Sequence, residues 1–314
     1  MTITTAVLVD YTRPSGNVHD LNACTRSGDW ILGATNTGQL LVRIHAPTDT
    51  VTWTDPWQSG AQDLRCVAVR PNGNVCFFRN SGTVHEVVPS TGATSTWSAG
   101  VALYGSPVTA TVGELAFLGN RVVNMSTHTT STYSTGLVSA LTVRDPSGDV
   151  WAIPGTAVPA QHIDPSTLTV TATGASPAAG AGIWQPFLFD GSIWWPGTGS
   201  QIIELDPTGP TYSAHSVAVV PAGLPSDRGD GTAAGVRRLN ATNNHAMQWS
   251  SPMTLIDGPT GLPSFFNGVY AAIGFDRHMY VIGSDVGIAT VRIVKVTFEP
   301  LPRRGGWSVG MIQW

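Results

Sequence analysis

Charged residues are scarce in this 314-residue chain, at 11% of the sequence, whereas an average soluble domain has about 25%. Lysine is scarcer still, because Lys295 is the only lysine among the basic residues. The formal net charge of −4 gives no electrostatic basis for binding nucleic acid or an anionic membrane surface. The surface must therefore be built largely from Ser, Thr, Asn and Gln, and we expect no nucleic-acid partner.

Cysteine is also rare, since the chain contains only Cys24, Cys66 and Cys76. A two-residue turn at Asn72-Gly73 would place Cys76 opposite Val69 rather than opposite Cys66. A disulfide across this hairpin is therefore not expected, because bridged cysteines need closely spaced Cα atoms. No CxxC motif and no Cys/His spacing indicates zinc, so we expect buried thiols, no metal and no cofactor.

Long apolar runs are absent too. No stretch of about 18 apolar residues is present that would span a bilayer, and the opening residues MTITTAVLVDYTRP lack the basic and apolar segments of a secretory leader. We therefore expect no membrane span. A virion location fits this pattern, with secretion without a leader and a cytoplasmic location as the alternatives.

What the sequence does contain is a repeat. A turn containing Gly or a polar residue precedes a short apolar segment seven times, with a spacing of about 42 residues, which is the length of a propeller blade. A second series of turns follows the next segment with the same count and the same period. The first series lies at Gly28, Gly73, Gly113, Gly148, Gly191, Asn244 and Arg277, and the second at Pro47, Pro89, Thr127, Pro165, Pro207, Pro259 and Pro300.

Each repeat is predicted to form four strands, which in the second repeat are residues 64–70, 74–79, 83–88 and 93–98. The segments after the first turn, such as VCFF, LAFL and IWW, are apolar nearly throughout. A strand covered on both faces has this composition, as in sheets packed face to face around a ring. No segment has convincing helical periodicity. We therefore predict an all-β fold, a seven-bladed β-propeller of four-stranded antiparallel blades, as one domain over residues 1–314.

Closure of the ring needs a partner strand, because an open sheet edge promotes aggregation. The last repeat supplies strands near 268–275, 278–282 and 291–298. We expect the N-terminal strand 2–9 to complete this blade, with the segment WSVGMIQW of the C-terminal tail 301–314 as the competing candidate. The segment 221–235, rich in Gly and Pro, is interpreted as an insertion before the first strand of the sixth repeat.

Residues 148–167 and 191–208 follow a repeated pattern, Gly-Asp/Asn-x-Trp/Phe and then Ile-Asp-Pro-Thr/Ser. This pattern resembles the repeats of streptogramin-lyase-like and NHL-type propellers. The resemblance covers most of the chain and implies the propeller fold. The lyase repeats carry an aromatic-Phe-Thr-Glu run, with catalytic His and Glu residues. The strands here read VWAIPG, VCFFRN and IWWPGT and lack Thr-Glu, so no catalytic residue is assigned. In its scarcity of charged residues and its preference for Arg over Lys, the chain is similar to phage tail or head-surface proteins.

The histidines share no register relative to the turns, and the few carboxylates lie mostly in turns, so spacing indicates neither a metal site nor paired catalytic carboxylates. Trp30, Trp151, Trp194 and Trp195 follow the first turns and are expected in the core. Aromatic and Arg residues in loops on one face suit recognition of a carbohydrate or a protein. Loop packing is the alternative explanation. These candidate binding residues are Tyr11, Arg13, Trp57, Tyr104, Arg228, Asp230, Phe265 and Phe266.

Three functions follow from these observations. The first is a non-enzymatic structural and binding propeller in a larger assembly, a phage tail or receptor-binding protein that contacts other virion proteins and a host-surface carbohydrate or protein. The second is a propeller lyase or hydrolase with a site at the central channel. The third is a cellular scaffold for protein interactions. The tripeptide Arg228-Gly229-Asp230 is too short to favour any of them.

Overall fold

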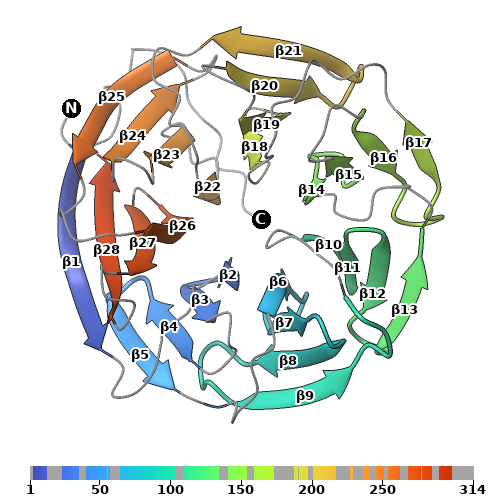
Figure 1. Ribbon diagram of the computed structural model, residues 1–314, viewed down its shortest axis with the longest axis horizontal. Helices are drawn as coiled ribbons and strands as arrows, with labels where there is room; N and C mark the ends of the chain where they lie inside the picture. The colour runs from blue at the N-terminus through green and yellow to red at the C-terminus, as the bar shows by residue number, and fades with distance from the viewer. Residues whose placement is uncertain are drawn as a thin grey trace.

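A computed structural model shows β-sheets arranged around a central axis (Figure 1). No helix occurs among the residues that the structure describes. These are 3–12, 23–34, 40–54, 56, 64–103, 109–133, 141–153, 159–172, 187–189, 191–196, 201–216, 227–228, 236–240, 245–250, 254–261, 268–276, 278–284 and 290–298.

Five sheets have four antiparallel strands each, in chain order from the centre outward (Figure 1). The first sheet is β2 (Ala23–Ser27), β3 (Trp30–Ala34), β4 (Leu41–His45) and β5 (Thr50–Thr54). The second is β6 (Leu64–Val69), β7 (Val75–Arg79), β8 (Thr83–Val87) and β9 (Thr94–Ser98). The third is β10 (Ala110–Val112), β11 (Leu115–Leu118), β12 (Arg121–Asn124) and β13 (Thr129–Thr132). The fourth is β14 (Leu141–Arg144), β15 (Val150–Ile153), β16 (Gln161–Ile163) and β17 (Val170–Ala172). The fifth is β18 (Phe187–Phe189), β19 (Ser192–Pro196), β20 (Gln201–Asp206) and β21 (Thr211–Ser216).

The remaining strands form a sheet of three and a sheet of five. The three-stranded sheet contains β23 (Val236–Asn240), β24 (His245–Ser250) and β25 (Thr254–Gly261). The five-stranded sheet, called the last sheet below, has the order β1 (Ile3–Thr12), β28 (Thr290–Phe298), β27 (His278–Ser284), β26 (Gly268–Phe275) and β22 (Asp227–Arg228). The first strand of the chain thus lies antiparallel to the last one, from Ile3 opposite Phe298 to Thr12 opposite Thr290.

One prediction for the sixth repeat was wrong. Pro259 was expected in a turn, but it lies inside β25, which pairs with β24 through bulges. Within the segment 221–235, which was interpreted as an insertion, Asp227–Arg228 form β22, which pairs in parallel with β26. Bulges let β25 continue past a residue that cannot donate a backbone hydrogen bond.

The hairpin between β6 and β7 has a three-residue loop, not the two-residue turn that Asn72-Gly73 suggested. The amide of Gly73 donates to the carbonyl of Arg70, and Gly73 alone in the loop has a positive φ, of 85°. Cys76 therefore lies opposite Ala68, one residue from the predicted Val69. Asp145 and Gly148 form the same loop, with Gly148 at φ 101°. All three cysteines are buried thiols outside any disulfide, as expected.

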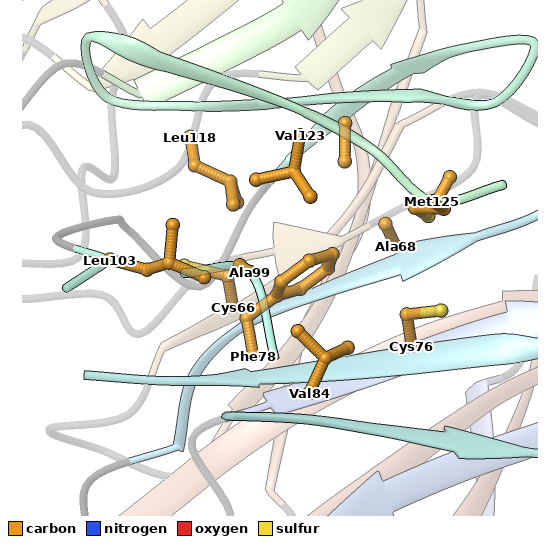
Figure 2. Close-up of a cluster of buried hydrophobic side chains, with 11 residues drawn as sticks. Cys66, Ala68, Cys76, Phe78, Val84, Ala99, Leu103, Leu118, Val123 and Met125 are labelled. Carbon is orange, nitrogen blue, oxygen red and sulfur yellow. The ribbon is translucent and has the colours of Figure 1, made fainter. Parts of the chain in front are cut away.

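The core lies between neighbouring sheets. Figure 2 shows the cluster between the second and third sheets, in which Phe78 of β7 meets Leu118 and Val123 of β11 and β12. Every residue of β7 is buried, because both its faces meet another sheet. Trp151, Trp194 and Trp195 are buried as predicted, whereas Trp30 is half-buried. Within the described residues, no helix is long and apolar enough to cross a membrane.

Candidate functional site on the turn face

Two kinds of turn come together at one end of the ring. In a four-stranded antiparallel sheet, the turn after the first strand and the turn after the third strand lie at the same end. We call this end the turn face. In the first four sheets it carries residues 28–29 and 46–49, 70–74 and 88–93, 113–114 and 125–128, and 145–149 and 164–169. The opposite end, called the loop face, carries the connections between sheets, where the binding residues were predicted.

Only two of the predicted binding residues lie in described backbone, and both lie in strands rather than loops. Tyr11 is in β1, opposite Val291, because β28 is long enough to pair with β1 as far as Thr12. Arg228 is in β22, opposite Ile273. They occupy the outermost and innermost strands of the last sheet, four strand spacings or about 19 Å apart. The structure does not bring these two together. Outside the described residues lie Arg13, Trp57, Tyr104, Asp230, Phe265 and Phe266.

The third-to-fourth-strand turns share a feature that sequence reasoning missed. Asp49, His128 and Leu168 all have a positive φ, between 55° and 59°. Each is the central residue of a Thr-x-Thr triplet whose hydroxyls are 2.8 to 2.9 Å apart. A left-handed backbone is unfavourable for a non-glycine residue. The repeated triplet was visible in the sequence and would have located these turns.

Each of these side chains contacts the preceding sheet around the ring. The ring of His128 stacks on Trp97 of the second sheet, with centroids 4.3 Å apart. Leu168 packs against a cluster that includes Phe117 and Tyr133 of the third sheet. Asp49 accepts hydrogen bonds from Lys295 (2.8 Å) and Tyr280 (2.6 Å) of the last sheet. The left-handed conformation therefore directs one side chain per turn onto a neighbouring sheet.

Asp49 is held in its ionised form. Partial burial raises the pKa of this carboxyl, but the hydrogen bonds from Lys295 and Tyr280 outweigh burial and hold the pKa below its usual range. Burial and the contact with Asp49 raise the pKa of the Tyr280 hydroxyl. The three side chains thus form a charged contact between the first and last sheets.

Arg70 makes the corresponding contact between the second and third sheets. Its Nε donates to Glu114 (2.9 Å) and its Nη1 to Glu86 (2.8 Å), which also accepts from Asn74 (2.6 Å). The hydrogen bond with Glu114 raises the pKa of Arg70 above its usual value. Burial, reinforced by the charge of Glu86, raises the pKa of the Cys76 thiol. This thiol is therefore protonated and a poor nucleophile.

We call the contact between two neighbouring sheets a seam. At the seam between the first and second sheets the direction is opposite, because a side chain of the first sheet contacts a turn of the second. In the second sheet the left-handed turn residue is Gly92, with φ 75°. A Cβ on Gly92 would lie 2.7 Å from Cζ of Arg43, because the arginine of the first sheet occupies that space. Arg43 donates from Nη1 to the carbonyl oxygen of Pro89 (2.7 Å), and its Cζ lies 5.5 Å from the ring centroid of Trp30.

The fourth sheet contains a serine, an aspartate and a histidine close together, but in an order unsuited to nucleophilic catalysis. Nε2 of His162 lies 2.9 Å from Asp149. The hydroxyl of Ser147 donates to Asp145 (2.6 Å) and lies 3.5 Å from Asp149. A hydrolytic triad needs the histidine between the hydroxyl and the carboxylate, whereas here the carboxylate lies between them. Among the described residues, no group of three His, Cys, Asp or Glu side chains could hold a metal ion.

Comparison with solved structures identifies the fold. A catalytically inactive virginiamycin B lyase from Staphylococcus aureus with quinupristin has a TM-score of 0.70 and 12% identity, over 95% of this chain and 100% of that one. A streptogramin B lyase gives 0.65 and 13%, over 94% and 98%. The β-propeller domain of Cps50 (Swd1) from Myceliophthora thermophila gives 0.59 and 12%, over 91% and 99%. The chain has a β-propeller fold that resembles those of the streptogramin lyases, as its repeats indicated. No family model and no curated protein sequence matches it.

Proposed function

We propose that the protein is a non-enzymatic binding propeller of a larger assembly, with seven blades of four strands. The propeller fold is compatible with a binding or scaffold role. The observation that carries the proposal is the ion pair of Asp49 with Lys295, in which a charged residue of the turn face binds a neighbouring sheet. Arg70 pairs with Glu114 across another seam. Both ion pairs join neighbouring sheets.

A count of seven four-stranded blades requires that the three-stranded sheet and β22 belong to one blade. Innermost strands of neighbouring propeller blades run in the same direction along the channel. If β22 is the innermost strand of the sixth blade and lies close to the next blade, it would pair in parallel with β26, as it does here. β22 to β25 then form the sixth blade, and β1 is the outer strand that closes the seventh. With this assignment the first strands β18, β22 and β26 begin at residues 187, 227 and 268, which fits the period of about 42 residues.

For the assembly we propose a phage virion, with the protein in the tail or the receptor-binding apparatus. The low charge, the threonine-rich outer strands and the propeller fold support this assignment. The loop face would contact a host-surface carbohydrate or protein, and other virion proteins would be its partners. Mass spectrometry of purified virions tests the location: the protein should be present at a fixed ratio to known tail components, and its absence would rule the assignment out.

Binding through the loop face has its own test. Labelled protein should bind host cells, and Trp57→Ala with Tyr104→Ala should reduce this binding at least about tenfold, equivalent to ~1.4 kcal/mol. Thr127→Ala is the matched control, because Thr127 is exposed on the turn face. Equal binding by the loop-face variant and the control would contradict a loop-face site.

A lyase is the second candidate, because the virginiamycin B lyase has the same fold over nearly the whole chain. The contacts of Ser147, Asp149 and His162 argue against serine hydrolysis at the fourth sheet. Incubation with a panel of cyclic depsipeptides, lactones and glycans, followed by mass spectrometry, separates the two functions. Turnover of any of these substrates would favour the enzyme.

A further inference from the structure

The tip of the β6–β7 hairpin holds an asparagine followed by a glycine. Asn72 is exposed, and Gly73 and Asn74 after it are partly exposed. Gly73 has a φ of 85° and no Cβ atom, so its backbone nitrogen is open to close approach. The nitrogen of a residue that follows asparagine can attack the side-chain carbonyl carbon, because the two atoms belong to the same short piece of chain and close a five-membered ring.

The side chain of Asn72 is folded back over this loop. Its Oδ1 accepts a hydrogen bond from the amide of Asn74 at 2.9 Å. The ring of atoms that this hydrogen bond closes contains both Cγ of Asn72 and the nitrogen of Gly73. The same N–H points at the oxygen on which negative charge develops during attack at Cγ, and such a donor stabilises that charge. The loop therefore holds the reacting groups together and supports the intermediate.

The nitrogen of Gly73 has one bond that opposes the reaction. Its N–H donates to the carbonyl oxygen of Arg70 at 2.9 Å, and this hydrogen bond must open before the nitrogen can lose its proton. The opening is confined to the loop, because Val69 remains opposite Val75 in the paired strands below it. No strand has to separate for Asn72 to react.

The other Asn-Gly pair of the sequence, Asn267-Gly268, provides an internal comparison. Asn267 lies outside the described residues, but Gly268 is the first residue of β26 and lies opposite Ser284 of β27. The backbone of Gly268 is therefore fixed in a sheet, whereas that of Gly73 lies in an exposed loop. The fold distinguishes two pairs that are identical in sequence.

We propose that Asn72 is a site of spontaneous deamidation in the folded protein. Hydroxide removes the proton of the Gly73 amide, and the nitrogen bonds to Cγ of Asn72. The side-chain nitrogen takes a proton from water and leaves as ammonia, which regenerates hydroxide. Water then adds to either carbonyl carbon of the succinimide and breaks its bond to the ring nitrogen. The product is an aspartyl or isoaspartyl residue at position 72, and the net reaction consumes one water and releases one ammonia.

Either product changes the turn face. The new carboxylate adds negative charge to a loop in which Arg70 already binds Glu86 and Glu114. An isoaspartyl residue also lengthens the loop backbone by one carbon, directly before Gly73, whose carbonyl oxygen accepts from Oγ of Ser27 at 2.7 Å. That hydrogen bond joins the first and second sheets, so deamidation loosens this seam with time. The inference does not depend on the binding function proposed above.

The experiment is incubation of the full-length protein in neutral and mildly alkaline buffer made with heavy-oxygen water, followed by peptide mass spectrometry. In the folded protein, position 72 should react at least about tenfold faster than position 267, equivalent to ~1.4 kcal/mol in activation free energy. In urea the two positions should react at similar rates, since the fold no longer distinguishes them. The rate at position 72 should rise with pH, because hydroxide removes the proton. Equal rates at the two positions in the folded protein, or no reaction at position 72, would overturn the proposal.

Two variants complete the test. Asn72→Gln keeps a carboxamide but requires a six-membered ring, which closes much more slowly. The incubated wild type should elute as a more acidic form on ion-exchange chromatography and lose thermal stability with the same time course, and Asn72→Gln should show neither change. Asn267→Gln is the matched control and should age as the wild type does. If Asn72→Gln becomes acidic as fast as the wild type, the proposal is wrong, and a thermal midpoint that stays constant while position 72 reacts would exclude the effect on the seam.

Discussion

Tyr280 and Asp49 are separated by 231 positions in the chain, yet the hydroxyl of Tyr280 donates to Oδ1 of Asp49 at 2.6 Å. The same hydroxyl lies 2.9 Å from the carbonyl oxygen of Ala46. A turn of the first sheet is thereby fixed to the last sheet by side chains, independently of the backbone pairing between β1 and β28.

Asp49→Asn should destabilise the protein by about 1–3 kcal/mol, since Lys295 keeps its charge but loses its partner. Asparagine tolerates the left-handed backbone that Asp49 adopts, so the variant isolates the charge. Urea unfolding measures the change. Asp164→Asn is the control and should change stability much less, because the Asp164 carboxylate accepts hydrogen bonds from Ser166 and Thr167 of its own turn.

The same variant should alter acid stability. The folded pKa of Asp49 lies below its unfolded value, so its contribution is complete above about pH 4 and is lost as the pH falls through the folded pKa. Thermal midpoints between pH 6 and pH 2.5 should therefore converge for the wild type and Asp49→Asn at the acid end. A constant difference across this range would contradict the ion pair.

His85 should make the protein less stable in mild acid. Burial, with the nearby charge of Arg79, lowers the pKa of His85 from 6.5 to about 4. The unfolded chain therefore binds a proton below about pH 6.5 that the folded protein excludes, and stability falls by up to about 1.4 kcal/mol per pH unit between these values. His85→Gln should flatten this part of the stability profile.

Gly92→Ala should cost more than a left-handed alanine costs elsewhere. Gly100 has the same φ, 75°, but a Cβ there would meet nothing within 4 Å. Gly100→Ala should therefore cost about 1–2 kcal/mol for the backbone alone. Gly92→Ala should cost at least about 1 kcal/mol more, because it displaces Arg43. In the Arg43→Ala background the two glycine substitutions should become equal, and a persistent difference would exclude the steric contact.

Deletion of residues 1–12 should cause association and loss of solubility, because it exposes the whole outer edge of β28. Deletion of the tail 301–314 should have a much smaller effect on the thermal midpoint. Size-exclusion chromatography and thermal unfolding compare the two. The reverse result would assign closure of the ring to the C-terminal segment.

Local sequence patterns determined much of this fold. The four strands predicted in the second repeat differ from β6 to β9 by one residue at most at each end, because turns and apolar runs are local signals. The register at Cys76 was missed by one residue, since Pro71 opens the loop and only Gly73 takes a positive φ. Pro259 was wrongly expected in a turn because the bulges that let β25 continue past it depend on the pairing of β25 with β24.

The contacts between neighbouring sheets could not be predicted from the sequence, for a different reason. Arg43 and Gly92 interact because two sheets pack together, and no local spacing relates them. The Thr-x-Thr triplets were visible as a repeat, but the direction in which Asp49, His128 and Leu168 point depends on a left-handed backbone. That conformation is uncommon for residues other than glycine.

The turn side chains contact the preceding sheet, and this limits how single repeats of the ring can be copied or exchanged during evolution. A repeat copied or exchanged alone would carry its turn residue without the surface that receives it. Gly92 moved next to a sheet without Arg43 would leave a gap, and a bulkier residue placed beside Arg43 would clash. A copied or exchanged repeat therefore fits only between sheets that carry the matching residues on the faces that receive it.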